Sequence, residues 1–165
     1  MMGFLSCACY IALIGGVSFV LGRIVPKSWF HWDKAPFAAY GFERQGKLYE
    51  KLGIRYWQKK LPDMSRILPG TMPAKKIGGD YKARLPQMLR ETCVAELTHW
   101  LLCVAGLHCL TLWPTVGGLA VVCLNILGNL PFILIQRYNR PRLARLLEKT
   151  GSRAAPEQEN ICQAE

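Results

Sequence analysis

The sequence predicts an all-α integral membrane protein with three transmembrane helices, and three observations support this prediction. Residues 1–22 contain no Lys, Arg, Asp or Glu, and neither does the stretch 97–136. A helix needs about 20 apolar residues to cross a bilayer, so the first stretch fits one span and the second fits two. Basic residues cluster beside these stretches and not within them. We therefore expect a single membrane domain over residues 1–165.

The first apolar stretch predicts a retained span over about residues 4–22. A cleaved signal peptide would begin with a positively charged segment, but the first basic residue, Arg23, comes after the apolar run. Basic residues gather on the cytoplasmic side of membrane helices. The first span is therefore expected to have its N-terminus outside the cell.

The second apolar stretch predicts two helices joined by a very tight turn. The turn is the sequence WPTVGG, residues 113–118. Pro114 disfavours helix in the residue before it, and the two glycines loosen the backbone after it. The predicted spans are therefore about 92–113 and 115–136.

Charge sets the orientation of the three spans. Residues 23–92 contain 15 Lys and Arg against 6 Asp and Glu, and residues 137–165 contain 6 against 4. Three spans with an outside N-terminus place the segment 23–91 and the tail 137–165 in the cytoplasm, and we expect the tail to be disordered after about residue 150. The net charge of +10 then lies beside membrane ends, which favours lipid headgroups or an anionic substrate over nucleic acid as partners.

The cytoplasmic segment contains a pattern typical of a basic amphipathic helix. At helical spacing, aromatic and aliphatic residues share one face and basic residues share the other: Phe42, Tyr49, Leu52 and Tyr56 against Arg44, Lys47, Lys51 and Arg55. Such a helix lies in the membrane interface. The alternative is a basic helix packed on a soluble subdomain. Gly46 and Gly53 weaken either helix by about 1 kcal/mol each.

A proline- and glycine-rich stretch, residues 61–80, follows this pattern and predicts a cytoplasmic loop. Its Lys75, Lys76, Gly78 and Gly79 do not complete a known phosphate-binding motif, so we expect a solvated loop.

Seven cysteines raise the question of disulfides or a metal site. Six lie in or beside apolar runs, and no Cys-x-x-Cys pair or Cys/His ligand spacing is present. The placement predicts free thiols that pack as small hydrophobes.

Two ionisable residues stand out inside the second predicted span. Glu96 and His99 lie one helical turn apart on the same face. A carboxylate within a span costs several kcal/mol unless it is paired, so such a residue indicates a functional site by default. The other histidine of this span, His108, faces elsewhere and is interpreted as satisfied or interfacial.

The third span has a polar stripe that the hairpin should bring to the same depth. Folding the chain at Pro114 places Glu96 opposite Phe132, because each is 18 residues from the turn. The stripe and the residues one turn nearer the cytoplasm are Asn125, Asn129, Phe132, Gln136, Arg137, Asn139 and Arg140. An acid, an imidazole, amides and guanidinium groups are thus expected to meet at the cytoplasmic rim.

Two less specific interpretations compete with a functional site. Polar residues on facing membrane helices can simply hold the helices together, at about 0.6 kcal/mol per contact, and Glu96 can pair with Arg137 or Arg140 for that purpose. A zinc site formed by Glu96, His99 and a cysteine lacks a clear third ligand.

Three sequence blocks resemble one protein family. AELTHW (95–100), NLPFILIQRYNRPRL (129–143) and GFERQGKLYEKLGIRYWQKKLPD (41–63) resemble the glycosyl-4,4'-diaponeurosporenoate acyltransferase family of small bacterial membrane proteins, associated with staphyloxanthin-type carotenoid synthesis. The resemblance covers roughly residues 20–148. It implies transfer of a fatty acyl group to a sugar hydroxyl on a membrane-embedded, glycolipid-like carotenoid. It also implies a multi-pass protein of the bacterial cell membrane.

The resemblance indicates site residues in two of these blocks. They are Glu96, His99 and Trp100 in the first, and Gln136, Arg137, Tyr138, Asn139, Arg140 and Arg142 in the second. Asn129, at the start of the second block, is added as a further substrate-binding candidate from the polar stripe.

A mechanism for acyl transfer follows from these residue types. His99 is the candidate general base, because the ordinary pKa of histidine near 6.5 suits that task, and Glu96 is expected to orient its ring. Arg137 and Arg140, with Asn139, are expected to hold the oxyanion or the phosphates of the acyl donor. The donor is acyl-CoA or acyl-carrier protein as co-substrate, and no cofactor or metal is expected.

Two other function classes remain open at this level: a membrane methyltransferase, and a non-enzymatic lipid-binding or scaffold subunit. Tight binding of S-adenosylmethionine would identify the methyltransferase. Mutants that lose assembly and not turnover would identify the scaffold subunit. The sequence leaves the oligomeric state open.

Overall fold

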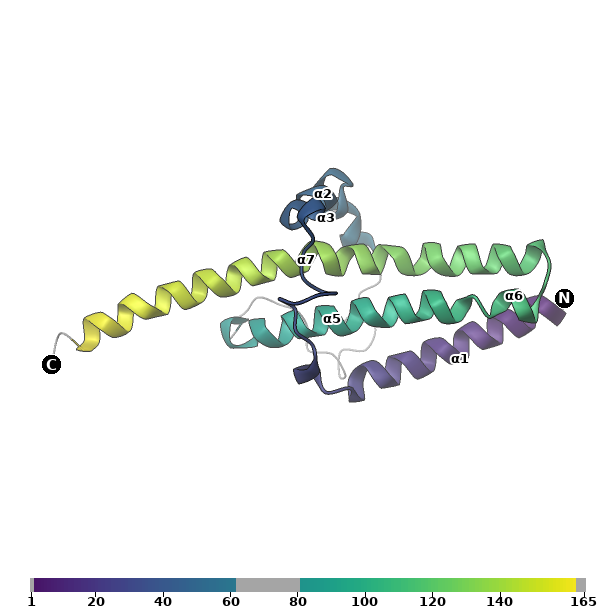
Figure 1. Ribbon diagram of the computed structural model, residues 1–165, viewed down its shortest axis with the longest axis horizontal. Coiled ribbons are helices and arrows are strands. Elements are labelled where there is room, and N and C mark those ends of the chain that lie inside the picture. Colours follow the sequence, from purple (N-terminus) through teal and green to yellow (C-terminus); the bar gives the residue numbers. More distant parts are fainter. Residues whose placement is uncertain (1, 62–80, 163–165) are drawn as a thin grey trace.

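The computed structural model of the protein describes residues 2–61 and 81–162, except for the side chains of residues 44, 45, 81 and 151–162. Within these residues the regular elements are helices, as predicted. Three long helices lie side by side: α1 (Met2–Ile24), α5 (Tyr81–Gly106) and α7 (Val116–Cys162), with α5 between the other two (Figure 1). A short helix, α6 (Cys109–Leu112), continues the line of α5 after a break.

Among the described residues, three helical stretches are long and apolar enough to cross a membrane: Met2–Ile24, Lys82–Leu112 and Val116–Thr150. Their number and order agree with the three predicted spans. The helices themselves are longer than the predicted spans, because the apolar run marks only the part of a helix that fits the hydrocarbon core of a bilayer. Thus α5 begins at Tyr81, and α7 continues to Cys162.

The hairpin turn falls where WPTVGG predicted it. Helix α6 ends at Leu112, and α7 begins at Val116. The backbone N–H of Trp113 donates to the carbonyl of Cys109 at 3.0 Å. The backbone is so close here that a Cβ on Gly118 would lie 2.0 Å from the Trp113 carbonyl oxygen, which only glycine avoids.

Helix α1 is attached to the hairpin near its turn, through Cys7 and Tyr10. Cys7 is buried, its thiol donates to the carbonyl of Cys109 at 3.7 Å, and both pack against Val122. The hydroxyl of Tyr10 donates to the carbonyl of Ala105 at 3.0 Å. The six cysteines whose surroundings are described are free thiols, and four of them are buried, as their placement predicted.

The predicted amphipathic helix is divided into short turns: η2 (Gly41–Gly46), α2 (Lys47–Lys51), α3 (Ile54–Trp57) and η3 (Gln58–Lys60). Gly46 and Gly53 cause the breaks, because their φ angles of 95° and 67° do not belong to a right-handed helix.

This divided segment lies against α7, on the side away from α5 (Figure 1). Its expected apolar face is also divided. Tyr49 is buried with Ile54 and Tyr138 in a small core, whereas Phe42 and Tyr56 are 68% and 77% exposed. The predicted loop residues Lys75, Lys76, Gly78 and Gly79 lie outside the described residues.

Candidate active site

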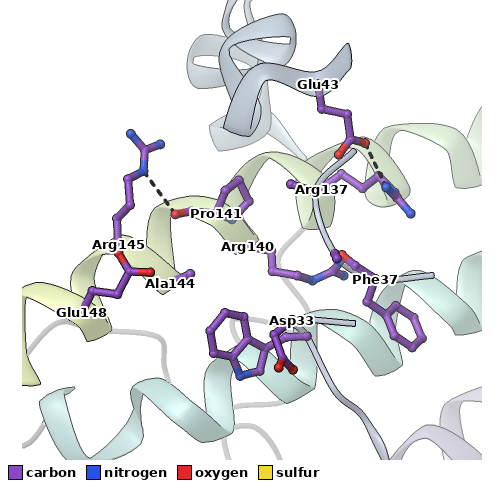
Figure 2. Close-up of a pocket in the computed structure, with 12 residues that line it drawn as sticks. Asp33, Phe37, Glu43, Arg137, Arg140, Pro141, Ala144, Arg145 and Glu148 are labelled. Atoms are coloured by element: carbon purple, nitrogen blue, oxygen red, sulfur yellow. Dashed lines mark hydrogen bonds and ion pairs between the residues drawn. The ribbon is translucent and has the colours of Figure 1, made fainter. Parts of the chain in front are cut away.

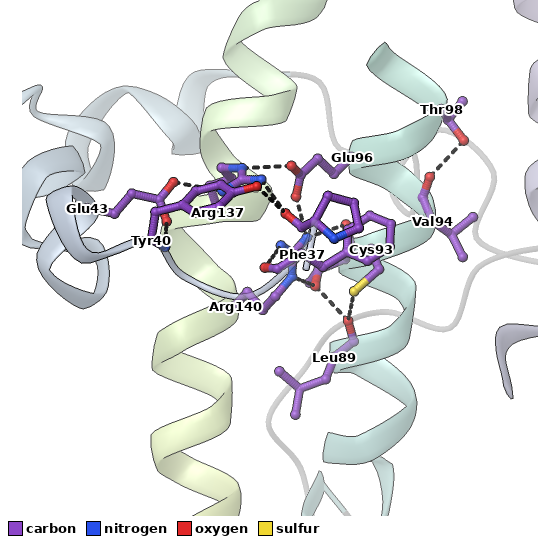
Figure 3. A network of polar contacts seen from close by, with 12 residues as sticks. Phe37, Tyr40, Glu43, Leu89, Cys93, Val94, Glu96, Thr98, Arg137 and Arg140 are labelled. Carbon is purple, nitrogen blue, oxygen red and sulfur yellow. Dashed lines mark hydrogen bonds and ion pairs between the residues drawn. The ribbon is translucent and has the colours of Figure 1, made fainter. Parts of the chain in front are cut away.

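The first polar cluster between α5 and α7 is centred on Glu96, which is 2% exposed. One carboxylate oxygen accepts a hydrogen bond from Nε of Arg137 at 2.7 Å, and the other accepts one from Nη2 of Arg140 at 2.6 Å (Figure 3). Both arginines come from α7, one turn apart. The carboxylate that the sequence placed inside a span is therefore doubly ion-paired.

Arg137 extends this cluster to the segment before α2. Its Nη1 donates to Glu43 at 2.9 Å, and its Nη2 donates to the carbonyl of Pro36 at 2.8 Å. Glu43 is 2% exposed and also accepts the hydroxyl of Tyr49 at 2.5 Å and the backbone N–H of Tyr40 at 2.9 Å. Burial, and then the hydrogen bond to Glu43, raise the pKa of the Tyr49 phenol, so this hydroxyl stays a donor.

Arg140 connects the same segment to α5. Its Nε donates to Oγ1 of Thr92 at 2.9 Å, its Nη1 to the carbonyl of Phe37 at 2.6 Å, and its Nη2 to the Thr92 carbonyl at 3.1 Å. Every guanidinium nitrogen of Arg137 and Arg140 thus has an acceptor within the protein. The two arginines, which the sequence predicted to bind a substrate anion, also hold residues 36–43 to the helix pair.

Charge is balanced in this buried network, because two carboxylates face two guanidinium groups: Glu43, Glu96, Arg137 and Arg140. Buried ions are tolerated only when each is paired and hydrogen-bonded. Removing any one member leaves an uncompensated net charge in the buried network. The network is therefore a structural lock, because its ion pairs join Glu43, α5 and α7.

The second polar cluster is centred on His99, which is half-buried. Its Nδ1 lies 2.8 Å from Oδ1 of Asn129, and its ring stacks on Phe132 with centroids 4.8 Å apart and planes 10° apart. This contact confirms the predicted register, since His99 and Asn129 are each 15 residues from Pro114. The partner of His99 is Asn129 and not Glu96, because the arginines take both oxygens of Glu96.

Asn129 is itself held by a second amide. Its Nδ2 donates to the backbone carbonyl of Asn125 at 2.8 Å and to Oδ1 of Asn125 at 3.1 Å. Nδ2 of Asn125 donates across the interface to the carbonyl of Leu102 at 3.0 Å. The polar stripe of α7 therefore forms one connected chain that ends at the imidazole.

The remaining predicted site residues lie in several directions. Gln136 and Asn139 are half-buried on α7, one and two turns beyond Phe132 toward the C-terminus. Tyr138 is fully buried, and Arg142 donates to its hydroxyl. Trp100 is 48% exposed on α5. Tyr138 and Arg142 are thus not brought to the imidazole, because Tyr138 packs against α2 and α3.

A pocket of about 440 Å³ opens beside the ion-paired network, between residues 32–43 and the part of α7 that follows Arg137 (Figure 2). Its lining combines an aromatic ring, carboxylates and guanidinium groups, among them Trp32, Asp33, Arg137, Arg140, Arg145 and Glu148. The charged side chains of this lining can contact the polar end of a ligand.

Comparison with known proteins supplies the family. A family model described as glycosyl-4,4'-diaponeurosporenoate acyltransferase matches residues 26–149. The chain belongs to this acyltransferase family. A relative of that name from Staphylococcus aureus strain MRSA252 is 28% identical over 137 residues, which cover 81% of this chain and 82% of the relative. The relative from strain N315 is 29% identical over 145 residues, with the same coverage. No solved structure matches.

Family membership decides between the function classes that the sequence left open. The protein is a membrane acyltransferase, and neither a methyltransferase nor a non-enzymatic scaffold is supported. In the part of the chain that the structure describes, no group of three His, Cys, Asp or Glu side chains could hold a metal ion.

Sequence reasoning missed part of the acyltransferase's polar cluster. Glu43 and Thr92 complete the lock around Glu96, yet neither was singled out. Glu43 had a detectable signal, since it is an acid in a predominantly basic stretch and lies within the resembling block 41–63. The carbonyls of Pro36 and Phe37 had none, because every residue has a carbonyl group.

Proposed function

We propose that this acyltransferase moves a fatty acyl group from acyl-CoA or acyl-carrier protein to a sugar hydroxyl of a glycosylated membrane lipid. The relatives' name, glycosyl-4,4'-diaponeurosporenoate acyltransferase, supports a glycosylated, carotenoid-like acceptor. The protein would be a multi-pass protein of the bacterial cell membrane with its N-terminus outside. The basic residues beside the spans support this orientation and put the site on the cytoplasmic side.

The observation that supports the chemistry best is the hydrogen bond between Nδ1 of His99 and Asn129, made inside an apolar helix pair. An imidazole held at one nitrogen offers the other to a substrate hydroxyl. His99 is thus the general base of the proposed reaction. Glu96, which the sequence assigned to orienting the ring, acts only by locking α5 to α7 through the two arginines.

The reaction proceeds by direct transfer. The hydroxyl oxygen attacks the thioester carbonyl while Nε2 of His99 takes its proton. The carbon–sulfur bond then breaks, and the thiolate leaves with the proton from the imidazolium. Gln136 and Asn139 lie on the same face of α7 as Phe132, at helical spacing, and their amides are the proposed donors to the oxyanion.

The pocket beside the network is the proposed entrance for a polar substrate group. It lies on the side of α7 that carries Arg145 and Glu148, beyond the apolar part of the helix. A water-soluble donor would approach from there, while its acyl chain and the lipid acceptor reach the site between the apolar helices.

The test is turnover of purified protein in lipid vesicles with labelled acyl-CoA and a glycosylated lipid acceptor. His99→Ala should lower kcat by about 10²-fold or more. His108→Ala is the matched control, because His108 is exposed between α5 and α6 and its ring nitrogen contacts Thr111 of α6. Wild-type turnover in folded His99→Ala protein, or equal losses in both variants, would remove His99 from the mechanism.

A further inference from the structure

We propose that Asn125 and Asn129 are positioning residues that fix the tautomer of His99. Their side-chain amides form a hydrogen-bonded relay that ends at the imidazole, and Gly106 makes room for this relay. The proposal rests on His99 as the general base. It adds a reason why the imidazole is held in one protonation form, with Nε2 free to accept a proton.

The relay is anchored on atoms that can only accept hydrogen bonds. The backbone carbonyl of Leu102 lies 3.0 Å from the Asn125 amide, so the amide atom facing it is the NH₂ group. The backbone carbonyl of Asn125 lies 2.8 Å from the Asn129 amide, so this amide also turns its NH₂ group away from His99. Oδ1 of Asn125, 3.1 Å from the same NH₂ group, supports the same orientation.

The direction of the last hydrogen bond follows. With its NH₂ group used, Asn129 presents Oδ1 to the imidazole, 2.8 Å from Nδ1 of His99. An amide oxygen only accepts, so Nδ1 must carry the proton, and Nε2 of the neutral ring keeps its lone pair. The same bond becomes stronger when the ring is cationic. The partner of the histidine in hydrolase triads stabilises the imidazolium in the same way.

Stacking completes the positioning of the ring. Phe132 lies parallel to the imidazole, with an interplanar angle of 10°, so it limits rotation of the ring out of the plane of the Asn129 bond. The amide relay and the aromatic face both come from α7, whereas His99 comes from α5. The tautomer therefore depends on the contact between the two helices.

Gly106 leaves the room that the amide of Asn125 occupies. A Cβ at this position would lie 2.1 Å from Nδ2 and 3.0 Å from Cγ of Asn125. The obstructed atoms are the amide end of Asn125, so an alanine here would push that amide off the Leu102 carbonyl. Gly106 lies seven residues from His99 on α5, about 10 Å along the helix axis. A substitution here would therefore disturb the imidazole only through the amides.

The test reads the tautomer directly by ¹⁵N NMR of protein in lipid nanodiscs. The chain has three histidines, so in a His31→Gln, His108→Gln background the imidazole signals belong to His99. At a pH where the ring is neutral, the expected form carries its proton on Nδ1. Asn129→Leu and Gly106→Ala should both shift the population toward the form protonated on Nε2, and should lower kcat by about 10²-fold with little change in KM.

Gly128→Ala is the matched control, because it is the same substitution on α7, at a position with nothing within 4 Å of a new Cβ. It should leave tautomer and kcat as in the wild type. Asn125→Leu replaces Gly106→Ala if the latter fails to fold. A wild-type ring protonated on Nε2 would overturn the relay, as would an unchanged tautomer in folded Asn129→Leu and Gly106→Ala proteins.

These outcomes are separable from the failure of the proposed function. If His99→Ala retains turnover while the tautomer responds to Asn129→Leu, the base assignment fails and the relay stands. If His99→Ala is inactive while the tautomer ignores the amides, the relay fails and the base assignment stands.

Discussion

Replacing Glu96 by Gln should destabilise the protein severely, because it removes a charge to which two buried guanidinium groups are bound. Glutamine has nearly the shape of glutamate, so the substitution creates no cavity. Its NH₂ group, however, must face one of the donors, Arg137 at 2.7 Å or Arg140 at 2.6 Å.

The magnitude follows from these two bonds. Hydrogen bonds to charged groups contribute about 1.5–3 kcal/mol each, and the side chains of Glu96 and Arg140 are 2% and 4% exposed, so water screens them little. Breaking a buried ion pair by removing one partner costs about 3–5 kcal/mol. The two bonds together give about 3–6 kcal/mol and the broken ion pair about 3–5 kcal/mol, so we expect a loss of about 3–5 kcal/mol in the free energy of unfolding.

The assay is unfolding by sodium dodecyl sulfate titration in mixed micelles, followed by circular dichroism. Glu91→Gln is the control, because Glu91 lies on the same helix and pairs with Lys27 at 3.3 Å, with side chains 27% and 35% exposed. An exposed pair of this kind contributes about 0–1 kcal/mol. If the two variants differ by less than about 1 kcal/mol, the network does not lock the helices as argued from burial.

Three further predictions concern the segment on α7 and the thiols. Gly46→Ala should lower the free energy of unfolding by about 1–2 kcal/mol, and by more than Gly53→Ala does. Both glycines have a positive φ, but only at Gly46 would the new Cβ meet a neighbour, 3.3 Å from Pro141. Equal losses of the two variants in the same titration would contradict this prediction. The raised pKa of Tyr49 means that its contribution to stability is full below about pH 10, the unfolded value, and is lost as the pH rises further. Stability measured above pH 10 should thus fall less steeply in Tyr49→Phe than in the wild type. Finally, the six described free cysteines should all be alkylated after denaturation without reductant, and a mass that shows two unmodified cysteines among them would indicate a disulfide.

The sequence alone was sufficient for the membrane frame and for one contact inside the site. Spans follow from apolar length, the hairpin follows from Pro114 and its glycines, and the rise per residue then places His99 opposite Asn129. This inference works because the short turn between the two arms of the hairpin leaves little freedom in their register. Distances along the helices were therefore predictable without any side-chain coordinates.

The tertiary structure alone decided how the charges are shared. Glu96 had two kinds of candidate partner: an imidazole one turn away on α5, and a pair of guanidinium groups on α7. The guanidinium groups bind both of its oxygens. The path of residues 36–43 brings Glu43 and two backbone carbonyls to the same arginines. That path is irregular, so no periodicity predicts it. The partner of a buried carboxylate depends on its distances to the neighbouring charged groups, and only the packed chain determines those distances.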